Sequence, residues 1–369
     1  MDNRRSLSSI LQQIASCEVV GLAFELVPTT DIRLFPDYVK GLHAWFLNQI
    51  QLVDPALSAY LHDGQSEKAF SLSRLQGPLE IHGRETCLKA QQSYFWYLSL
   101  LSKRTIEGVI EWLGKPPQSL SLVHRPLVIK NIELFFPPVT YQELWQGPIN
   151  QKLELSFLSP TSFRRKGNHF PLPVPNNIFH SYLRRWNDFS GRPIEAEDFL
   201  NWIDESVRID RHWLESLKVS GIKGGNFTGF VGAIALSLTP QGLKHRLYRQ
   251  VWSALGRFAP YCGTGHKTTF GLGQTRLGWS LPEHERVLFS VDNAKAEALN
   301  YRVEVLREIL LKQQKRPDNE RAFKICQTKA TILARREWGE SLQAIALDLG
   351  IPYETAKTYS KRAKHELRL

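Results

Sequence analysis

The chain has 369 residues, of which 42% are hydrophobic, including 10 Trp, 19 Phe and 11 Tyr. This length predicts two or three domains, and the apolar content excludes an intrinsically disordered chain. Lys and Arg outnumber Asp and Glu by 47 to 36, so that the net charge of +11 favours a polyanionic partner such as a nucleic acid.

The cysteines and the hydropathy pattern narrow the class of protein further. No Cys-x-x-Cys pair is present, which argues against a zinc site and a secreted disulfide scaffold; the four residues are Cys17, Cys87, Cys262 and Cys326. The N-terminal segment lacks the apolar core of a signal peptide, and no run of about 18 apolar residues predicts a membrane span. We therefore expect a cytoplasmic protein without a metal, a cofactor or a membrane partner.

The first part of the chain predicts alternating strands and helices. Residues 18–28 are β-branched and aromatic and end at a proline, which is typical of a strand. Residues 37–51 place apolar side chains at helical spacing. Further strands are predicted at residues 70–75, 79–82 and 128–136, with a helical stretch over 93–113. The order β-α-β-β-α-β is typical of a ferredoxin-like (RRM-like) fold, and we expect this domain to span residues 1–147.

The pattern then restarts in a second part, expected to span residues 148–285. It predicts a strand from Lys152, a helix over residues 177–189, strands at 217–222 and 227–238, and a helix over 241–255. This order permits a second ferredoxin-like unit. The fold class is therefore α+β.

Residues 286–369 are charged and helical, and we expect them to form an all-α domain. Residues 294–314 predict one long helix, and residues 341–364 predict two helices with a turn at Gly350. This is typical of a helix-turn-helix, in which Ile345 and Ala346 pack inward and the second helix presents Thr355, Lys357, Thr358 and Lys361 outward. The pattern predicts a contact with nucleic acid or protein.

The most informative stretch is residues 261–276, with the sequence YCGTGHKTTFGLGQTR. His266 separates Gly265 from Lys267, which excludes a P-loop, and Thr268 takes the place of the third glycine of a dinucleotide loop. Glycines point backbone N–H groups into a concavity, so that this loop is a candidate cradle for phosphates. The alternative is a set of plain hairpin turns.

The spacing of Gly263, Gly265, Gly271 and Gly273 resembles the glycine-rich loop of the RAMP superfamily. More narrowly, it is similar to that of the CRISPR-associated endoribonucleases that cut repeat RNA, the sixth Cas protein family. Three other stretches resemble the same family in the same order: residues 60–75, with a Leu-His-(x)n-Lys-x-Phe segment, residues 158–186, and the glycine-rich residues 221–232. The resemblance covers residues 18–280 and implies two ferredoxin-like units in tandem.

This resemblance implies RNA cleavage without a metal ion, in which the ribose 2′-OH attacks the adjacent phosphate and leaves a 2′,3′-cyclic phosphate. The reaction needs a base, an acid and a cation, tasks that histidine and lysine can perform. His62 and Lys68 match the catalytic histidine and lysine of the family segment. The family's tyrosine on the first helix is replaced near Ala44, and the adjacent His43 is a further candidate for acid or base.

The resemblance also implies contacts with RNA. His266 and Lys267 are candidates for phosphate contacts in the glycine-rich loop, and Arg164, Arg165 and Lys166 form a basic run on the expected cleft wall; each could instead be a solvated turn residue. Arg184 and Arg185 could contact a phosphate, whereas Trp186 is expected in the core.

We expect an endoribonuclease that matures CRISPR precursor RNA by binding and cutting each repeat. One alternative is a non-catalytic RNA-binding subunit that joins other Cas effector subunits. The other is a regulator that binds nucleic acid through its helix-turn-helix.

Overall fold

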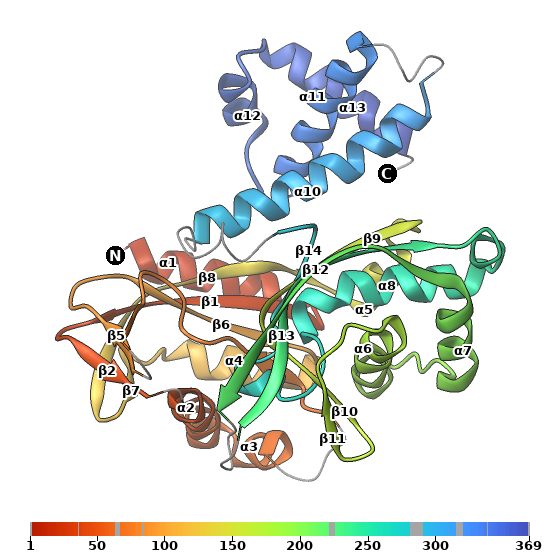
Figure 1. Ribbon diagram of the computed structural model, residues 1–369. Coiled ribbons are helices and arrows are strands. Elements are labelled where there is room, and N and C mark those ends of the chain that lie inside the picture. Colours follow the sequence, from red (N-terminus) through yellow and green to blue (C-terminus); the bar gives the residue numbers. More distant parts are fainter. Residues whose placement is uncertain are drawn as a thin grey trace. The chain divides into compact units, whose positions relative to one another are not determined.

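The computed structural model describes residues 2–35, 37–62, 67–82, 85–220, 226–280, 291–314, 320–337 and 339–367. Two compact units are present, Met1–Val291 and Asp292–Leu369 (Figure 1). The predicted strand around residues 217–222 and the glycines of residues 221–225 lie partly or wholly outside the described residues. No helix in the described part of the chain is long and apolar enough to cross a membrane.

The first unit contains two ferredoxin-like sheets, as predicted. The first sheet has the order β3-β6-β1-β8-β7, and every neighbouring pair is antiparallel. Its strands are β1 (Val19–Pro28), β3 (Phe70–Leu72), β6 (Tyr94–Leu100), β7 (Ser119–Leu122) and β8 (Arg125–Val139). The helices of this part are α1 (Asp2–Ile14), α2 (Tyr38–Val53), α3 (Pro55–His62) and α4 (Lys103–Gly114), and a small second sheet contains β2 (Ile32–Leu34), β4 (Glu80–His82) and β5 (Glu85–Leu88).

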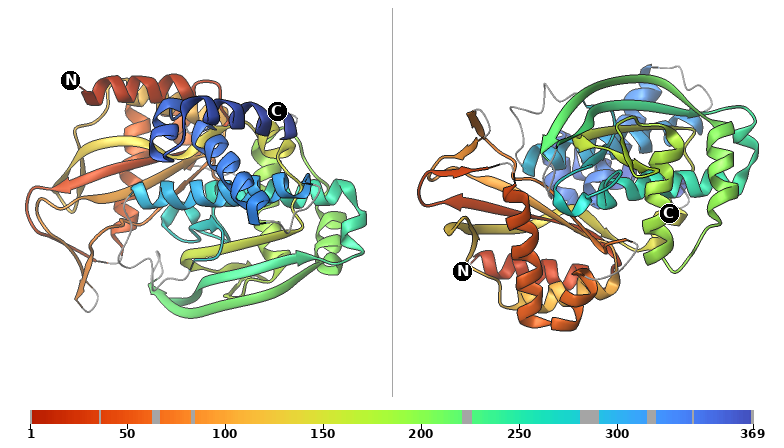
Figure 2. Two further views of the ribbon diagram at one scale, coloured as in Figure 1. Left: turned by 90° about the horizontal axis from the view of Figure 1, so that it is seen from above. Right: turned by 60° about the horizontal axis from the view of Figure 1, so that its bottom comes forward.

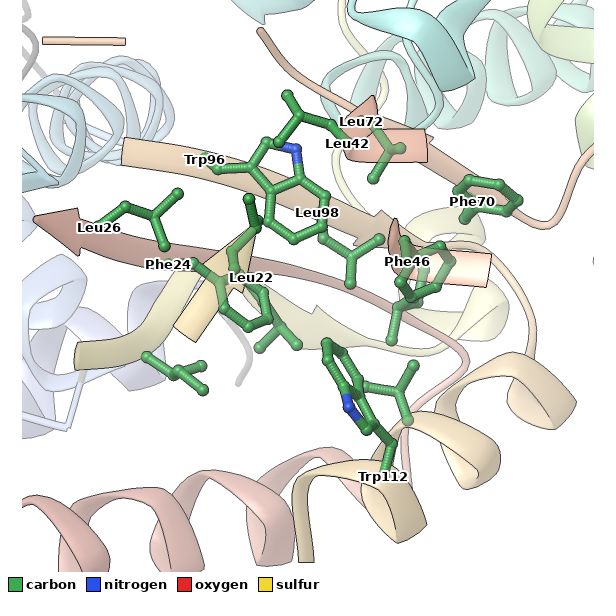
Figure 3. Packing of buried hydrophobic residues seen from close by; sticks show 14 of the residues in the cluster. Leu22, Phe24, Leu26, Leu42, Phe46, Phe70, Leu72, Trp96, Leu98 and Trp112 are labelled. Atoms are coloured by element: carbon green, nitrogen blue, oxygen red, sulfur yellow. The ribbon is translucent and has the colours of Figure 1, made fainter. Parts of the chain in front are cut away.

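Aromatic side chains hold α2 and α4 against the first sheet. Phe24 of β1 lies 5.1 Å from Trp96 of β6 and 5.9 Å from Trp112 of α4, measured between ring centroids. Phe46 of α2 packs on both Phe70 and Trp112 (Figure 3). Burial of such rings is the dominant stabilising contribution to a core, so these contacts fix the position of α2, which carries His43.

The second sheet has the order β12-β13-β9-β14, which corresponds to β3-β6-β1-β8 of the first sheet without its edge strand β7. Its strands are β9 (Lys152–Thr161), β12 (Val207–Ser220), β13 (Asn226–Leu238) and β14 (Thr275–Leu277), and a hairpin of β10 (Phe163–Arg165) and β11 (Asn168–Phe170) follows β9. The helices are α5 (Tyr141–Gln146), α6 (Pro175–Phe189), α7 (Ala196–Ser206) and α8 (Arg246–Cys262), with short 3₁₀ helices η1 (Gly242–Lys244) and η2 (Thr268–Phe270).

Helix α8 joins the two halves of this unit. It contacts β1, β3 and β6 of the first sheet as well as α5, α6 and β14 (Figure 2). The hydroxyl group of Tyr261 in α8 donates to the carbonyl oxygen of Pro137, and Ser71 of β3 donates to the carbonyl oxygen of Tyr261. Helix α8 therefore contributes packing and hydrogen bonds to the contact between the two halves. The domain boundary at residue 147 stays a prediction.

The second unit consists of α10 (Val291–Lys312), α11 (Glu320–Glu337), α12 (Leu342–Asp348) and α13 (Tyr353–Leu367). The long helix and the helix pair around Gly350 were both predicted. Ile345 and Ala346 are buried against Ala356 of α13 and Ile332 of α11, as expected for the inner face of a helix-turn-helix. Its assignment as a separate domain of residues 286–369 stays a prediction.

The predicted helical stretch over residues 93–113 was wrong in its first half. Residues 94–100 form β6, which lies between β1 and β3, and only α4 is helical. The strand is buried on both faces except for Phe95, so it lacks the alternation of polar and apolar residues by which a strand is usually found. Helix α8 also extends further than expected, so that Tyr261 and Cys262 belong to the helix rather than to the glycine-rich loop.

Candidate RNA-processing site

The glycine-rich loop is closed on itself. A Cβ atom at Gly273 would lie 1.9 Å from the carbonyl oxygen of Thr264, and one at Gly265 would lie 2.4 Å from that of Ser162. Both glycines have positive φ angles, 68° and 79°, which disfavour other residues. The backbone of Thr264 donates to the carbonyl oxygen of Gly273 at 2.7 Å. These glycines therefore allow two backbone segments to touch.

Three of the loop's glycine N–H groups already have acceptors inside the protein. Gly263 donates to the carbonyl oxygen of Ala259, Gly265 to the hydroxyl of Ser181, and Gly273 to the carbonyl oxygen of Pro160. All four glycines are buried, including Gly271, which packs on Arg74. The predicted phosphate contacts of the glycines stay predictions, and the contacts in the structure show that the glycines shape the loop.

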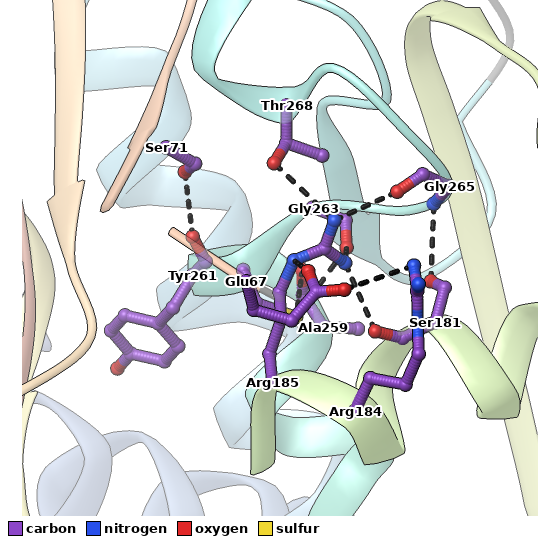
Figure 4. Close-up of polar contacts among 11 residues, drawn as sticks. Glu67, Ser71, Ser181, Arg184, Arg185, Ala259, Tyr261, Gly263, Gly265 and Thr268 are labelled. Carbon is purple, nitrogen blue, oxygen red and sulfur yellow. Dashed lines mark hydrogen bonds and ion pairs between the residues drawn. The ribbon is translucent and has the colours of Figure 1, made fainter. Parts of the chain in front are cut away.

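A buried ion pair holds the loop to the segment that carries Lys68. Arg185 of α6 is 4% exposed and its Nη2 donates to the carbonyl oxygen of Gly265 at 2.7 Å, while its Nε lies 3.1 Å from a carboxylate oxygen of Glu67 (Figure 4). Glu67 is 6% exposed and its other oxygen pairs with Arg184 at 3.0 Å. Buried charges of this kind fix position, since separating them would leave each charge without compensation. The basic pair was noticed in the sequence, but nothing there identified Glu67 as its partner.

His43 of α2 contacts the loop directly. Its Nδ1 lies 3.1 Å from the carbonyl oxygen of Thr269, and its ring stacks on Phe270 with a centroid separation of 4.2 Å. Because a carbonyl oxygen only accepts, Nδ1 carries the proton of this hydrogen bond, and in the neutral ring Nε2 is the basic nitrogen. Burial lowers the pKa of His43 below its usual value, and the charges of His62 and Lys68 lower it further. This tautomer and this charge state suit a general base.

Helix α3, which ends at His62, packs against α2, the helix that carries His43. His62 is the exposed last residue of α3, a helix that was not predicted from the sequence. The ammonium group of Lys68 donates to the backbone carbonyl oxygen of His62 at 2.9 Å. Residues 63–66, which connect them, lie outside the described residues. The structure thus brings the three candidate catalytic residues together.

A pocket of about 320 Å³ adjoins this group, and Lys68 and Thr269 are among its lining residues. The lining is rich in basic side chains and has one acid, Glu67, which already pairs with two arginines. The basic or titratable residues that line it are Lys68, Arg164, His180, Arg184, Arg185, His266 and Lys267. Such a lining favours a polyanion.

Two buried polar atoms of the pocket lining are candidates for hydrogen bonds to a ligand. Among the residues that the structure describes, Nδ2 of Asn177 and Nε2 of His266 are buried without a hydrogen bond. The Nδ1 of His266 lies 2.6 Å from the carbonyl oxygen of Ser162, and burial lowers the pKa of His266 to about 4. His266 is therefore neutral near pH 7, with Nε2 as an acceptor. One unpaired donor and one acceptor suit a ligand with polar edges.

The predicted basic run divides between the pocket and the solvent. Arg164 lines the pocket and donates to the carbonyl oxygen of Gly167 at 2.6 Å. Arg165 lies over the ring of Phe170, and Lys166 occupies the exposed turn between β10 and β11 with φ 49°. Neither of these two lines the pocket. No group of three His, Cys, Asp or Glu side chains able to hold a metal ion occurs among the described residues.

Two family models match the chain. The Cas6 N-terminal domain matches residues 20–115, and the CRISPR-associated endoribonuclease Cas6 matches residues 155–275. Together they cover more than half of the 369 residues, including every candidate residue of the site. No curated protein matches the chain.

Solved structures of Cas6 proteins share the fold. A Thermus thermophilus Cas6 product complex has a TM-score of 0.59 at 24% identity and covers 70% of this chain and 100% of its own. A second Cas6 product complex has a TM-score of 0.56 at 26% identity, with coverages of 70% and 99%. A Cas6 complex with a substrate mimic has a TM-score of 0.54 at 25% identity, with coverages of 71% and 100%.

Proposed function

The chain belongs to the Cas6 family of CRISPR-associated endoribonucleases, and we propose that it cleaves CRISPR precursor RNA within each repeat, without a metal ion, by attack of a ribose 2′-OH. The products are a strand ending in a 2′,3′-cyclic phosphate and a strand beginning with a 5′-OH. The relatives of known structure include complexes with a product and with a substrate mimic, which supports an RNA ligand for this chain.

The main observation in support of this proposal is that His43, His62 and Lys68 are grouped beside a basic pocket. These residues come from two helices and a loop of the first half, and Thr269 and Phe270 of the second half complete their surroundings. A base, a second proton carrier and a cation within one site are what the transfer reaction requires. A simple binding surface would not need a histidine held neutral by burial.

We propose the following proton transfers, which the tautomer of His43 supports. Nε2 of His43 takes the proton of the 2′-OH as the 2′-oxygen forms a bond to phosphorus. The bond between phosphorus and the 5′-oxygen breaks, and protonated His62 gives its proton to that leaving oxygen. The ammonium group of Lys68 stabilises the charge on the pentacoordinate phosphorane. The protons balance, because His43 gains one and His62 loses one.

The pocket beside the three residues binds the flanking RNA in this proposal. Arg164, Arg184 and Lys267 provide positive charge for phosphate oxygens, and Asn177 and His266 provide the unpaired donor and acceptor for a base edge. Arg185 takes no part in binding, since its guanidinium is buried against Glu67 and the loop carbonyls.

The test is cleavage of end-labelled repeat RNA from the same genome in the presence of EDTA. Wild type should cut once and leave a cyclic phosphate, and a 2′-deoxy substitution at the cut should abolish cleavage while sparing binding. His43→Ala and His62→Ala should each slow single-turnover cleavage by about 10²- to 10⁴-fold. His212→Ala changes an exposed histidine on β12 and is the matched control.

Two outcomes would contradict the proposal. Cleavage that needs added metal would remove the metal-independent mechanism. Tight binding of the repeat without a cut would favour the alternative function of a non-catalytic RNA-binding subunit.

A further inference from the structure

All candidate residues of the cleavage site lie in the first compact unit, and neither family model extends beyond residue 275. The helix pair α12 and α13 of the second unit is connected as in a helix-turn-helix. The hydroxyl of Ser341 caps α12 by accepting from the backbone of Ala344 at 3.1 Å, and Gly350 takes a φ of 62° in the turn. The backbone of Ile351 then donates to the carbonyl oxygen of Ala346, which closes the turn.

Two sets of ion pairs hold the helix pair α12 and α13 against α11. Arg335 of α11 is paired with both Glu340 and Asp348, which lie just before α12 and at its end. Lys329 of α11 is 5% exposed and its Nζ lies 2.6 and 2.8 Å from the two carboxylate oxygens of Glu366 on α13. Both ends of the helix pair are thus fixed to α11, which lets the exposed face of α13 act as one preformed surface.

The ion pair between Lys329 and Glu366 also leaves the outer face of α13 strongly basic. Glu366 is neutralised by Lys329, so that Glu354 is the one remaining acid within the described span of this helix, and it pairs with Lys357 at 3.7 Å. The exposed side chains of the helix beyond its first turn are Lys357, Thr358, Lys361, Arg362, Lys364 and His365. Ala356 and Ala363 are fully buried on the opposite side. The exposed positions recur at intervals of three and four residues and therefore form one continuous stripe.

The order of residues along α13 matches a helix that enters a groove. Its first turns expose Tyr353, Glu354 and Thr358, side chains able to contact base edges. Its later turns expose Lys361, Arg362 and Lys364, which suit phosphates. An apolar surface for a protein partner is not present on this face, where Tyr353 is the one exposed large hydrophobic residue of the described helix.

We propose that this unit binds double-stranded DNA, with α13 lying in the major groove. The major groove of B-form DNA is about 12 Å wide and admits an α-helix, which is about 10–12 Å across with its side chains. The major groove of an A-form RNA duplex is deep and too narrow for side chains to enter. The geometry therefore selects DNA over duplex RNA, and this binding is independent of RNA cleavage.

The experiment measures the salt dependence of binding by the full chain to a DNA duplex of about two helical turns and to an RNA duplex of the same sequence. The variant K357Q/K361Q/K364Q removes three exposed charges of the stripe. The control K103Q/K115Q/K324Q removes three exposed lysines elsewhere, so that both variants have the same net charge. Because all six side chains are exposed, both variants should fold, which circular dichroism checks.

For DNA, a plot of log K against log salt has a negative slope, and its magnitude should decrease by about 2 to 3 in the stripe variant. This decrease is about 0.9 for each phosphate that is no longer neutralised. The slope should stay within about 0.5 of wild type in the control variant, and the stripe variant should change RNA duplex binding by less than half as much. An unchanged DNA slope, an equal fall in both variants, or an equal effect on the RNA duplex would overturn the proposal. An equal effect on RNA would identify a general polyanion surface instead.

Discussion

His43 and Thr269 are 226 residues apart in the sequence, yet Nδ1 of the first lies 3.1 Å from the carbonyl oxygen of the second. This hydrogen bond fixes which nitrogen of the imidazole is basic. Stacking on Phe270 excludes water from the ring, and burial accordingly lowers the pKa of His43. The glycine-rich loop thus determines the chemistry of a histidine on a distant helix.

The pH dependence of cleavage should report this environment. A base must be neutral, so a lowered pKa keeps His43 active to lower pH, and the acid limb of single-turnover cleavage should lie below pH 6.5, the usual histidine value. Phe270→Ala exposes the ring to water and should move this limb upward towards 6.5. An acid limb that stays in place in the variant would exclude Phe270 as the cause of the shift.

The two arginines that share Glu67 should differ greatly in their effect on stability. Arg185 is buried, so Arg185→Ala leaves Glu67 partly uncompensated and the loop carbonyls without a donor, which should cost about 3–5 kcal/mol. The side chain of Arg184 is 48% exposed, and Arg184→Ala should cost about 0–1 kcal/mol. Urea unfolding of the two variants measures both values. Similar losses would show that the buried pair has no special role.

Close backbone approach at the loop predicts a contrast between two glycines of the same unit. Gly191 has a φ of 65° and open space where a Cβ atom would lie, so Gly191→Ala should cost about 1–2 kcal/mol from backbone strain alone. Gly273→Ala adds a collision with the carbonyl oxygen of Thr264 and should cost more than about 4 kcal/mol or prevent folding. Thermal unfolding distinguishes the two, and equal losses would contradict the packing argument.

His266 should make stability depend on pH in a defined direction. Its pKa is lowered to about 4 in the folded protein from 6.5, so its contribution is fully present above pH 6.5 and is lost as the pH falls from 6.5 towards 4. The loss is on the order of 3 kcal/mol, at about 1.4 kcal/mol for each pKa unit. His43, His169 and His180 have lowered pKa values as well, so the total fall is shared.

The variant His266→Gln isolates this one contribution, since its amide can still donate to Ser162. The free energy of unfolding of the wild type minus that of the variant should decrease from pH 7 to pH 4, because only the wild type loses the contribution of His266. A difference that stays constant over this range would show that His266 does not titrate as the structure implies.

Much of the fold could be predicted because most elements are amphipathic. Strand β1 and helices α2 and α6 were predicted within three residues of their observed ends. Strand β6 was missed, since burial on both faces removes the periodic signal. Of the site, the three candidate catalytic residues and most of the basic ones were identified through the family resemblance. Their partners Glu67, Thr269 and Phe270 were not identified, because their contacts join segments that are far apart in the sequence.

The candidate site needs residues from both halves of the first unit, so its formation depends on how far translation has proceeded. A growing chain that has completed only the first sheet already contains His43, His62 and Lys68, but not the loop that desolvates and orients His43. Arg185, which anchors Glu67 next to Lys68, is also still to be made. The nascent protein therefore carries its candidate catalytic side chains long before the loop exists, and the proposed activity requires translation to have passed Phe270.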